Sequence, residues 1–190
     1  MGVLLAAILF VTLLTFSALF VFSIVIFALH HRTGGAFFVP TPMPMVESLL
    51  KNMDFSRFRD IRELGCGDGR LISAVERASG RAVIGYEINP IAFAMTWLRI
   101  RILSLKSEVR CADFWNIDLS SADCIYCYLF PDVMTRLAEK LEQELHEGTC
   151  VISANFPVPG WREEAIIRAR DTIFDDPIFV YYKGRAAPDP

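Results

Sequence analysis

A run of glycines between an acidic residue and an arginine is the part of this sequence best suited to chemistry. The run reads Glu63-Leu64-Gly65-Cys66-Gly67-Asp68-Gly69-Arg70 and follows a short apolar segment. Glycine lets the backbone turn sharply and approach a ligand that a Cβ atom would keep away. A second carboxylate, Glu87, ends the next apolar run, where it can accept hydrogen bonds from both hydroxyls of a ribose. This layout predicts a cleft for a cofactor that contains adenosine.

The spacing of the glycines distinguishes between two cofactors that contain adenosine, a dinucleotide and S-adenosylmethionine. A dinucleotide fingerprint reads G-x-G-x-x-G, and its third glycine lets a helix pack closely beneath a pyrophosphate. Here the spacing is G-x-G-x-G, and Arg70 stands where that third glycine belongs. Glu63 and Asp68 flank the loop, which suits the ammonium group of a bound amino acid and repels a pyrophosphate. The loop therefore favours S-adenosylmethionine over a dinucleotide, with a strand–turn–helix that binds no ligand as the third interpretation.

Short apolar runs alternate with helical patterns after residue 60, and this alternation indicates the fold class. We expect strands over residues 60–64, 81–86, 109–112, 124–130 and 149–154, and an antiparallel pair over 165–173 and 178–182. We expect helices that begin near Pro44, Arg70, Pro90 and Pro131. Such units form a doubly wound, mostly parallel α/β sheet with right-handed connections. Ligands bind beyond the carboxyl ends of the strands in such sheets, where the glycine loop, Glu87 and Asp113 fall.

The helix expected after Pro90 is long and amphipathic. Asn89 is placed to cap its first turn, because an asparagine side chain can accept from backbone N–H groups there. Five apolar side chains recur at the spacing of one helix face: Ile91, Met95, Leu98, Ile102 and Leu105.

The first 29 residues carry no charged side chain and are mostly apolar. About 20 apolar residues span the core of a bilayer, so we expect residues 1–32 to form a transmembrane anchor. A cleavable signal peptide would carry a basic residue before a shorter apolar run, and none is present here. Basic residues follow the run, beginning with Arg32 and Lys51. The positive-inside bias then predicts that the rest of the chain faces the cytoplasmic side of a bacterial inner membrane or an organelle membrane.

Charge and cysteine content exclude other classes of function. The net charge is −3 and no basic tract is present, so we expect no nucleic-acid partner. The five cysteines are an odd number in a domain expected to face the cytosol, which favours free thiols. Cys124 and Cys127 fall within one expected strand, where positions three apart point to opposite faces. We therefore expect no metal site.

Three motifs together resemble the class I (seven-β-strand) S-adenosylmethionine-dependent methyltransferases. They are the run from Glu63 to Arg70, then Gly85-Tyr86-Glu87-Ile88-Asn89-Pro90, and finally Asp113-Phe114-Trp115. More narrowly, the chain is similar to the small membrane-anchored lysine methyltransferases whose mitochondrial members modify the ATP synthase c subunit and the adenine nucleotide carrier. That likeness covers roughly residues 37–161 and includes Phe38-Val39-Pro40-Thr41-Pro42, Tyr128-Leu129-Phe130-Pro131 and Asn155-Phe156-Pro157-Val158-Pro159. Members of that group more often have arginine where this chain has Asn155, a difference that bears on the substrate.

The resemblance implies a role for each matching residue. The methionine part of the cofactor is held by Glu63, Gly65, Cys66, Gly67, Asp68 and Gly69. The ribose is held by Glu87, with Ile88 and Asn89 beside it, and Thr41 closes over the cofactor. Asp113 accepts from the adenine amino group, while Phe114 or Trp115 packs on the ring. The channel for the acceptor amine is shaped by Tyr128, Phe130 and Pro131, which are the candidate catalytic residues.

The composition, the element pattern and the resemblance together divide the chain and indicate a reaction. We expect an anchor over residues 1–32, a linker and helix over 33–59, a methyltransferase domain over 60–184 and a loose tail over 185–190. The first hypothesis is an enzyme that N-methylates a lysine of a membrane-associated protein. The alternatives are a methyltransferase for a lipid amine or another small amphiphile, and a membrane module that binds S-adenosylmethionine without catalysis. A nicotinamide-dependent oxidoreductase would need a residue pair for hydride transfer, which the sequence does not present.

Overall fold

The computed structural model describes residues 2, 10–21, 39–169 and 176–184, and it divides the chain into two compact units, Met1–Phe37 and Phe38–Pro190. In the first unit, residues 10–21 are helical and their side chains are exposed. Within the described ranges, no helix combines the length and hydropathy needed to cross a bilayer. Most of the anchor predicted over residues 1–32 lies outside the described residues, so it stays a prediction.

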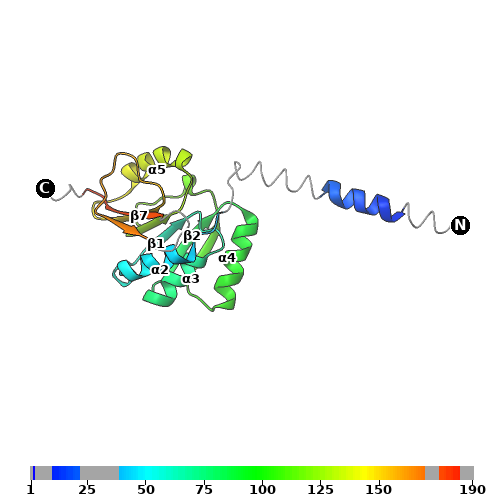
Figure 1. Ribbon diagram of the computed structural model, residues 1–190, viewed down its shortest axis with the longest axis horizontal. Helices are drawn as coiled ribbons and strands as arrows, with labels where there is room; N and C mark the ends of the chain where they lie inside the picture. The colour runs from blue at the N-terminus through cyan, green and yellow to red at the C-terminus, as the bar shows by residue number, and fades with distance from the viewer. Residues whose placement is uncertain (1, 3–9, 22–38, 170–175, 185–190) are drawn as a thin grey trace. The chain divides into compact units, whose positions relative to one another are not determined.

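The second unit is a seven-stranded sheet with helices on both faces (Figure 1). Its helices are α2 (Met43–Asn52), α3 (Arg70–Ser79), α4 (Pro90–Ile102) and α5 (Pro131–Glu144), with short 3-10 helices at Phe55–Arg57 and Phe114–Asn116. Its strands are β1 (Ile61–Leu64), β2 (Val83–Glu87), β3 (Glu108–Cys111), β4 (Cys124–Cys127), β5 (Cys150–Ala154), β6 (Ala165–Arg168) and β7 (Pro177–Tyr182). The strand order is β3-β2-β1-β4-β5-β7-β6. Strands β1 to β5 are parallel, and β7 runs antiparallel to β5 and β6, so the predicted fold class is confirmed.

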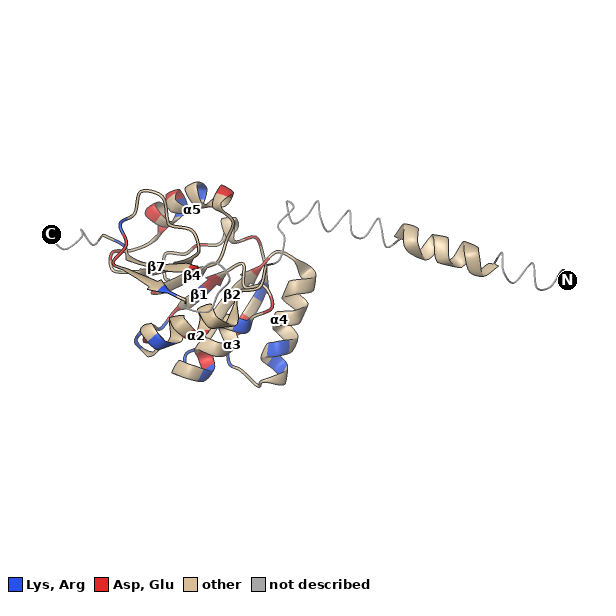
Figure 2. Ribbon diagram, viewed as in Figure 1, with Lys and Arg blue, Asp and Glu red and all other residues tan. Residues whose placement is uncertain are grey.

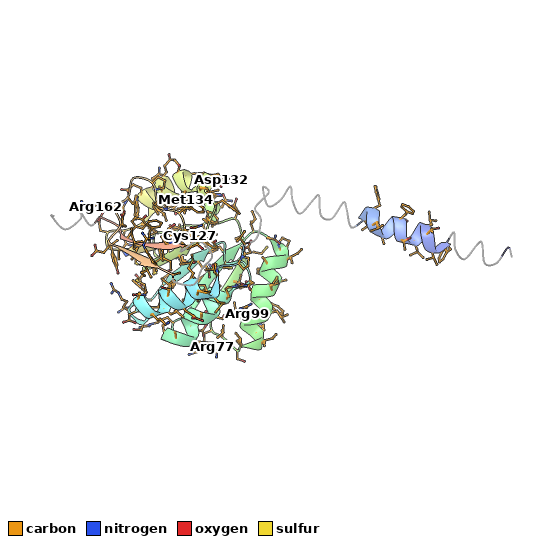
Figure 3. All side chains as sticks on the ribbon, viewed as in Figure 1. Arg77, Arg99, Cys127, Asp132, Met134 and Arg162 are labelled. Atoms are coloured by element: carbon orange, nitrogen blue, oxygen red, sulfur yellow. The ribbon has the colours of Figure 1, made fainter. Side chains whose placement is uncertain are left out.

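Two apolar cores lie on opposite faces of this sheet. One packs α2 and α3 against the sheet and includes Leu49, Ile72 and Tyr126, whereas the other packs α5 against the sheet and includes Leu137 and Ile125. Each such side chain contributes roughly 1.5–3 kcal/mol when it is fully buried. Alternation along β4 places Cys124 in the first core and Cys127 in the second, as their spacing predicts. Figure 3 labels Cys127 near the middle of the sheet and Met134 on α5.

Strand β4 is shorter than the sequence predicts. It ends at Cys127, which is paired with Leu64, the last residue of β1. Because β1 turns into the glycine loop after Leu64, residues 128–130 have no residue of β1 to pair with. Phe130 is extended, with φ −72° and ψ 153°, as expected for a residue that precedes proline. Residues 128–130 therefore connect β4 to α5 at the carboxyl edge of the sheet.

An amphipathic helix usually buries its apolar stripe, but helix α4 exposes its stripe and buries another face. Its buried residues are Ala92, Thr96 and Ile100, while the apolar stripe from Ile91 to Ile102 is exposed. Small side chains on the buried face allow a close approach to the glycine loop, because a Cβ atom on Gly69 would lie 2.6 Å from Thr96 Cγ2.

Candidate active site

The glycine loop forms a tight turn at the carboxyl end of β1. Gly65, Gly67 and Gly69 have φ angles of +73°, +57° and +71°, in the left-handed region that side chains disfavour. The N–H groups of Gly65 and Cys66 both donate to the carbonyl of Tyr86, at 2.9 and 3.1 Å. These bonds hold the turn against the end of β2, so the predicted loop and Glu87 are brought together.

Glu63 is a buried carboxyl group at the predicted cofactor cleft. Its Oε2 atom has no hydrogen-bond partner among the described residues. Burial raises the pKa of Glu63 well above its usual value, and the charges of Asp68 and Glu87 raise it further. A buried acceptor without a partner is unfavourable, and a bound ammonium group would satisfy it. The methionine part of S-adenosylmethionine carries such a group, so this cleft fits the predicted cofactor.

Glu87 has two tasks in the same cleft. Its Oε2 atom accepts from the backbone N–H of Gly67 at 2.8 Å, and its Oε1 atom accepts from that of Asn89 at 2.8 Å. Each carboxylate oxygen keeps a lone pair for a ribose hydroxyl. Asn89 in turn caps α4, since its Oδ1 atom accepts from the N–H groups of Ile91 and Ala92 at 2.9 and 3.4 Å. Glu87 therefore also supports the backbone on both sides of the cofactor cleft.

The substitution Glu87→Gln tests the ribose assignment. It keeps one of the two oxygens that accept from the backbone and replaces the other with an amide donor. It also removes the negative charge that strengthens hydrogen bonds from ribose hydroxyls. We expect calorimetric titration to show S-adenosylmethionine binding about tenfold weaker, a loss of about 1.4 kcal/mol. Glu76→Gln is the matched control, because Glu76 also accepts from two backbone N–H groups, those of Lys106 and Ser107, but lies outside the cleft. Equal affinity in the Glu87 variant and the control would show that Glu87 does not hold the ribose.

Asp68 joins the glycine loop to two other segments. Its carboxylate forms ion pairs with Arg70 at 3.0 Å and with Arg99 of α4 at 2.9 Å, the residue labelled in Figure 3. Arg70 also donates to the carbonyl of Thr41 at 3.0 Å. Burial alone would raise the pKa of Asp68, but the two guanidinium groups lower it below its usual value. These pairs hold the loop, α4 and the Thr41 segment in place, while direct contact of Asp68 with the cofactor stays a prediction.

Thr41 and Thr96 lie close to the same loop. Thr41 is buried beside Tyr126, where burial raises the pKa of the tyrosine and the threonine side chain opposes that shift. Thr96 is fully buried and its hydroxyl donates to the carbonyl of Gly67 at 2.6 Å. The motifs of the sequence do not point to Thr96, although it is a polar residue on the apolar helix that follows Glu87.

The predicted adenine segment follows β3 and lies beside Glu87. The N–H of Ala112 donates to the carbonyl of Glu87 at 3.1 Å, and Asp113 Oδ1 accepts from the N–H of Trp115 at 3.0 Å. The rings of Phe114 and Trp115 lie 4.7 Å apart, and the guanidinium of Arg136 lies 4.1 Å from the Trp115 ring centroid. Trp115 is therefore held against α5, and adenine binding by this segment stays a prediction.

The predicted acceptor segment, residues 128–130, lies against the glycine loop. A Cβ atom on Gly65 would be 3.0 Å from Leu129 Cδ2. Phe130 is 46% exposed at the start of α5, and Pro131 beside it is exposed, whereas Tyr128 is half-buried. Burial raises the pKa of Tyr128, and the charge of Asp176 raises it further. Leu129 and Asp176 also lie at this predicted site, although the sequence pattern indicates no role for either. Asp176 reaches this edge only because β7 pairs with β5.

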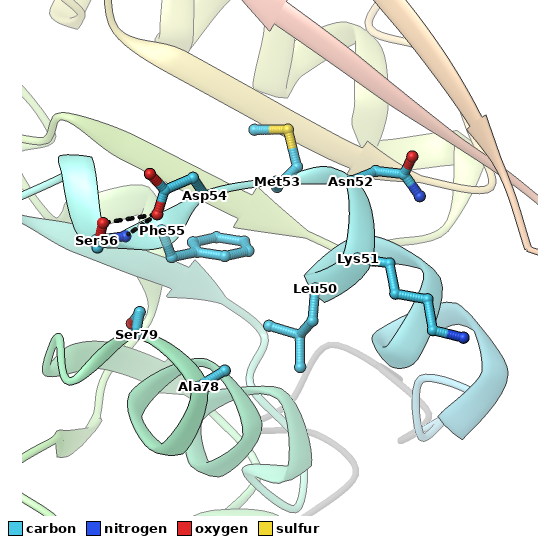
Figure 4. A pocket seen from close by; sticks show the side chains of 9 residues that line it. All are labelled: Leu50, Lys51, Asn52, Met53, Asp54, Phe55, Ser56, Ala78 and Ser79. Atoms are coloured by element: carbon cyan, nitrogen blue, oxygen red, sulfur yellow. Dashed lines mark hydrogen bonds between the residues drawn. The ribbon is translucent and has the colours of Figure 1, made fainter.

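A separate hollow, shown in Figure 4, lies at the opposite end of the sheet. It is lined by residues 50–56 together with Ala78 and Ser79. Helix α3 starts at the glycine loop and ends at Ser79, so this hollow adjoins the amino ends of the strands. Asp54 there accepts from the backbone N–H and the hydroxyl of Ser56, at 3.0 and 2.6 Å. Its lining therefore includes none of the residues predicted to bind the cofactor.

The known proteins that resemble this chain are methyltransferases. Residues 63–165 match the family described as the ANTKMT methyltransferase domain. A protein-lysine N-methyltransferase of Saccharolobus islandicus (strain REY15A) is 30% identical over 150 residues, which are 77% of this chain and 93% of that protein. The adenine nucleotide translocase lysine N-methyltransferase of Mus musculus is 32% identical over 107 residues, which are 55% of this chain and 47% of that protein.

A solved structure supports both the fold and the predicted cofactor. The RNA methyltransferase from Salinibacter ruber, in complex with S-adenosyl-L-homocysteine, superposes with a TM-score of 0.69 and 26% identity. The match covers 80% of this chain and 98% of that chain. S-adenosylmethionine is therefore the cofactor of this protein. Because the family model matches more than half of the chain and the sheet is mostly parallel with a glycine loop after β1, the chain belongs to the ANTKMT methyltransferase family, within the class I S-adenosylmethionine-dependent methyltransferases.

Proposed function

We propose that this enzyme N-methylates the ε-amino group of a lysine in a membrane-associated protein. The observation that carries this proposal is the apolar and aromatic segment 128–130 packed against the cofactor loop, with Leu129 over Gly65. Relatives named for lysine methylation of the adenine nucleotide translocase and of the ATP synthase c subunit support the same acceptor class.

The reaction requires the protein mainly to position the substrate and to exclude water. When bound, the cofactor supplies a methyl group that is already activated for transfer to a neutral amine. The protein must therefore align the amine, exclude water and bring the lysine into its uncharged form. Tyr128 and Phe130 provide an apolar surface that disfavours the ammonium form, which lowers the pKa of an entering lysine. Asp176, beside Tyr128, carries negative charge that attracts the lysine as it approaches.

The membrane setting is the second part of the proposal. Residues 1–29 are uncharged and mostly apolar, which is the composition of a bilayer-spanning segment. A tether to the bilayer raises the effective concentration of substrates in the same membrane. The basic residues after this segment favour a catalytic domain on the cytoplasmic side.

Transfer of radiolabel tests the acceptor class. Full-length protein is incubated with S-adenosylmethionine labelled in the methyl group and with native membranes, which are then separated into protein, lipid, RNA and small molecules. We expect label in protein, on lysine after hydrolysis. Label confined to the lipid or small-molecule fraction would favour the amphiphile alternative, and label in RNA would favour the substrate class named for the Salinibacter ruber relative. Cofactor binding without label in any fraction would favour a non-catalytic module.

A further inference from the structure

Helix α4 exposes a continuous apolar stripe to solvent. Ile91, Met95, Leu98 and Ile102 are 57%, 45%, 51% and 70% exposed. They recur at i, i+4, i+7 and i+11, so they lie along one face over about 16 Å of helix. None of the described residues buries this stripe, and a run of exposed apolar side chains on a single face marks an interaction surface.

The charged residues of helix α4 are all basic. Helix α4 contains no acidic residue, and its last turn carries Arg99 and Arg101. Figure 2 shows this helix without red along its length and with blue towards its C-terminal end. The guanidinium of Arg101 lies 5.5 Å from the ring centroid of Trp97, which is itself 47% exposed. A tryptophan and an arginine next to an apolar stripe are typical of helices that lie in the headgroup region of a bilayer.

We propose that α4 lies flat on an anionic phospholipid surface, with Ile91, Met95, Leu98 and Ile102 in the boundary between headgroups and acyl chains. Arg101 contacts lipid phosphates, and Trp97 lies at headgroup depth. This inference rests on the membrane setting of the proposed function and adds a second contact between the protein and the bilayer. This orientation also brings the predicted active site near the bilayer, because α4 begins at Pro90, three residues after Glu87. The edge of the sheet that carries the cofactor cleft is then held close to the membrane surface.

The shape and charge of the surface favour lipid over a protein partner. The stripe lies on the outer side of one helix, and neither the hollow of Figure 4 nor the one beside His146 includes any of its residues, whereas a partner helix is usually received in a groove. Arg101 beside it complements anionic headgroups and contributes to binding near the surface. Arg99 leaves the stripe to pair with Asp68, so the same helix is tied to the glycine loop.

Quenching of tryptophan fluorescence by brominated lipid tests this placement. The full-length protein is reconstituted into vesicles of phosphatidylcholine and phosphatidylglycerol, with or without bromine atoms on the acyl chains near the headgroups. We expect bromine to reduce the emission of the wild-type protein and to leave Trp97→Phe unaffected, because Trp115 and Trp161 are half-buried within the folded domain. Leu98→Glu, on the exposed face, should abolish the reduction, whereas Ile166→Glu at the exposed strand β6 should retain it.

The outcomes separate this inference from the proposed function. Wild-type emission that bromine leaves unchanged, or changes equally in Trp97→Phe, would overturn the lipid contact even if lysine methylation is observed. Quenching that depends on Trp97, together with methyl label found only outside protein, would support the contact and overturn the lysine substrate. A third outcome is that bromine does not quench the wild-type protein, that the wild-type protein is dimeric in detergent and that the Leu98→Glu variant is monomeric. This outcome would assign the stripe to a second copy of this chain instead.

Discussion

Replacing Glu63 by glutamine is expected to weaken S-adenosylmethionine binding by about 10- to 100-fold and to stabilise the cofactor-free protein. The buried Oε2 atom lacks a partner among the described residues, and an ammonium group bound there would form a charge-assisted hydrogen bond. Such bonds contribute about 1.5–3 kcal/mol, which corresponds to the expected loss of affinity. The neutral amide avoids the cost of keeping this buried carboxyl group protonated above its usual pKa in the free protein, so the unfolding temperature should rise.

The pH dependence follows from the raised pKa of Glu63, which burial produces first and the charges of Asp68 and Glu87 increase. In the unfolded chain this carboxyl group loses its proton near its usual pKa, whereas in the folded protein it holds the proton to higher pH. The folded state therefore binds more protons between these two pKa values, and its stability falls as pH rises through that window. Glu63→Gln should lack this contribution.

Cofactor binding should release a proton over the same window, because the ammonium group favours the ionised carboxylate. Titration calorimetry in buffers of different ionisation enthalpy measures that release directly. Glu108→Gln, which changes an exposed carboxylate on β3, is the control and should leave both affinity and proton release unchanged. Wild-type affinity in Glu63→Gln, with no proton released by the wild-type protein, would contradict the assignment of Glu63.

Replacing Phe130 by alanine is expected to slow methyl transfer by roughly 100-fold with little change in cofactor affinity. Phe130 is partly exposed at the carboxyl edge of the sheet, and it follows Leu129, which packs against Gly65 of the glycine loop. Removing the ring admits water to the acceptor channel and loosens the alignment of the amine, and misplacement of about 1 Å can reduce a rate by about 10²-fold.

Single-turnover rates on membrane acceptors, compared with the dissociation constant for S-adenosylmethionine, separate these two effects. Ile166→Ala is the matched control, since Ile166 is 43% exposed on the edge strand β6 and distant along the sheet from β1. If Phe130→Ala transferred methyl groups at the wild-type rate, segment 128–130 would not form the acceptor channel.

The features that the sequence predicts correctly depend on short-range patterns. The glycines at 65, 67 and 69 adopt positive φ, as a tight turn requires, and Asn89 caps α4 with Pro90 at its first position. The alternation of strands and helices likewise determines a parallel sheet, because connections of this length leave few other arrangements. The convergence of the glycine loop, Glu87 and Asp113 at one edge of the sheet was predictable for the same reason, because these residues follow or end consecutive strands.

The features that the sequence does not reveal depend on contacts between distant segments. Asp68 pairs with Arg99, 31 positions away, and Asp176 reaches Tyr128 only through the pairing of β7 with β5. Helix α4 turns its apolar stripe outward because Thr96 packs closely against Gly69, which puts the face that carries Ala92 and Thr96 inside. Periodicity identifies an apolar face but does not say whether a protein core or another surface covers it.

A crystal structure of the protein with S-adenosyl-L-homocysteine is the most direct test of the cofactor cleft. We predict that the amino group of the ligand lies within about 3 Å of Glu63 Oε2 and that the ribose hydroxyls donate to Glu87. The sulfur should face the segment from Tyr128 to Phe130. A ligand bound away from the glycine loop, or a ribose that makes no contact with Glu87, would contradict this account.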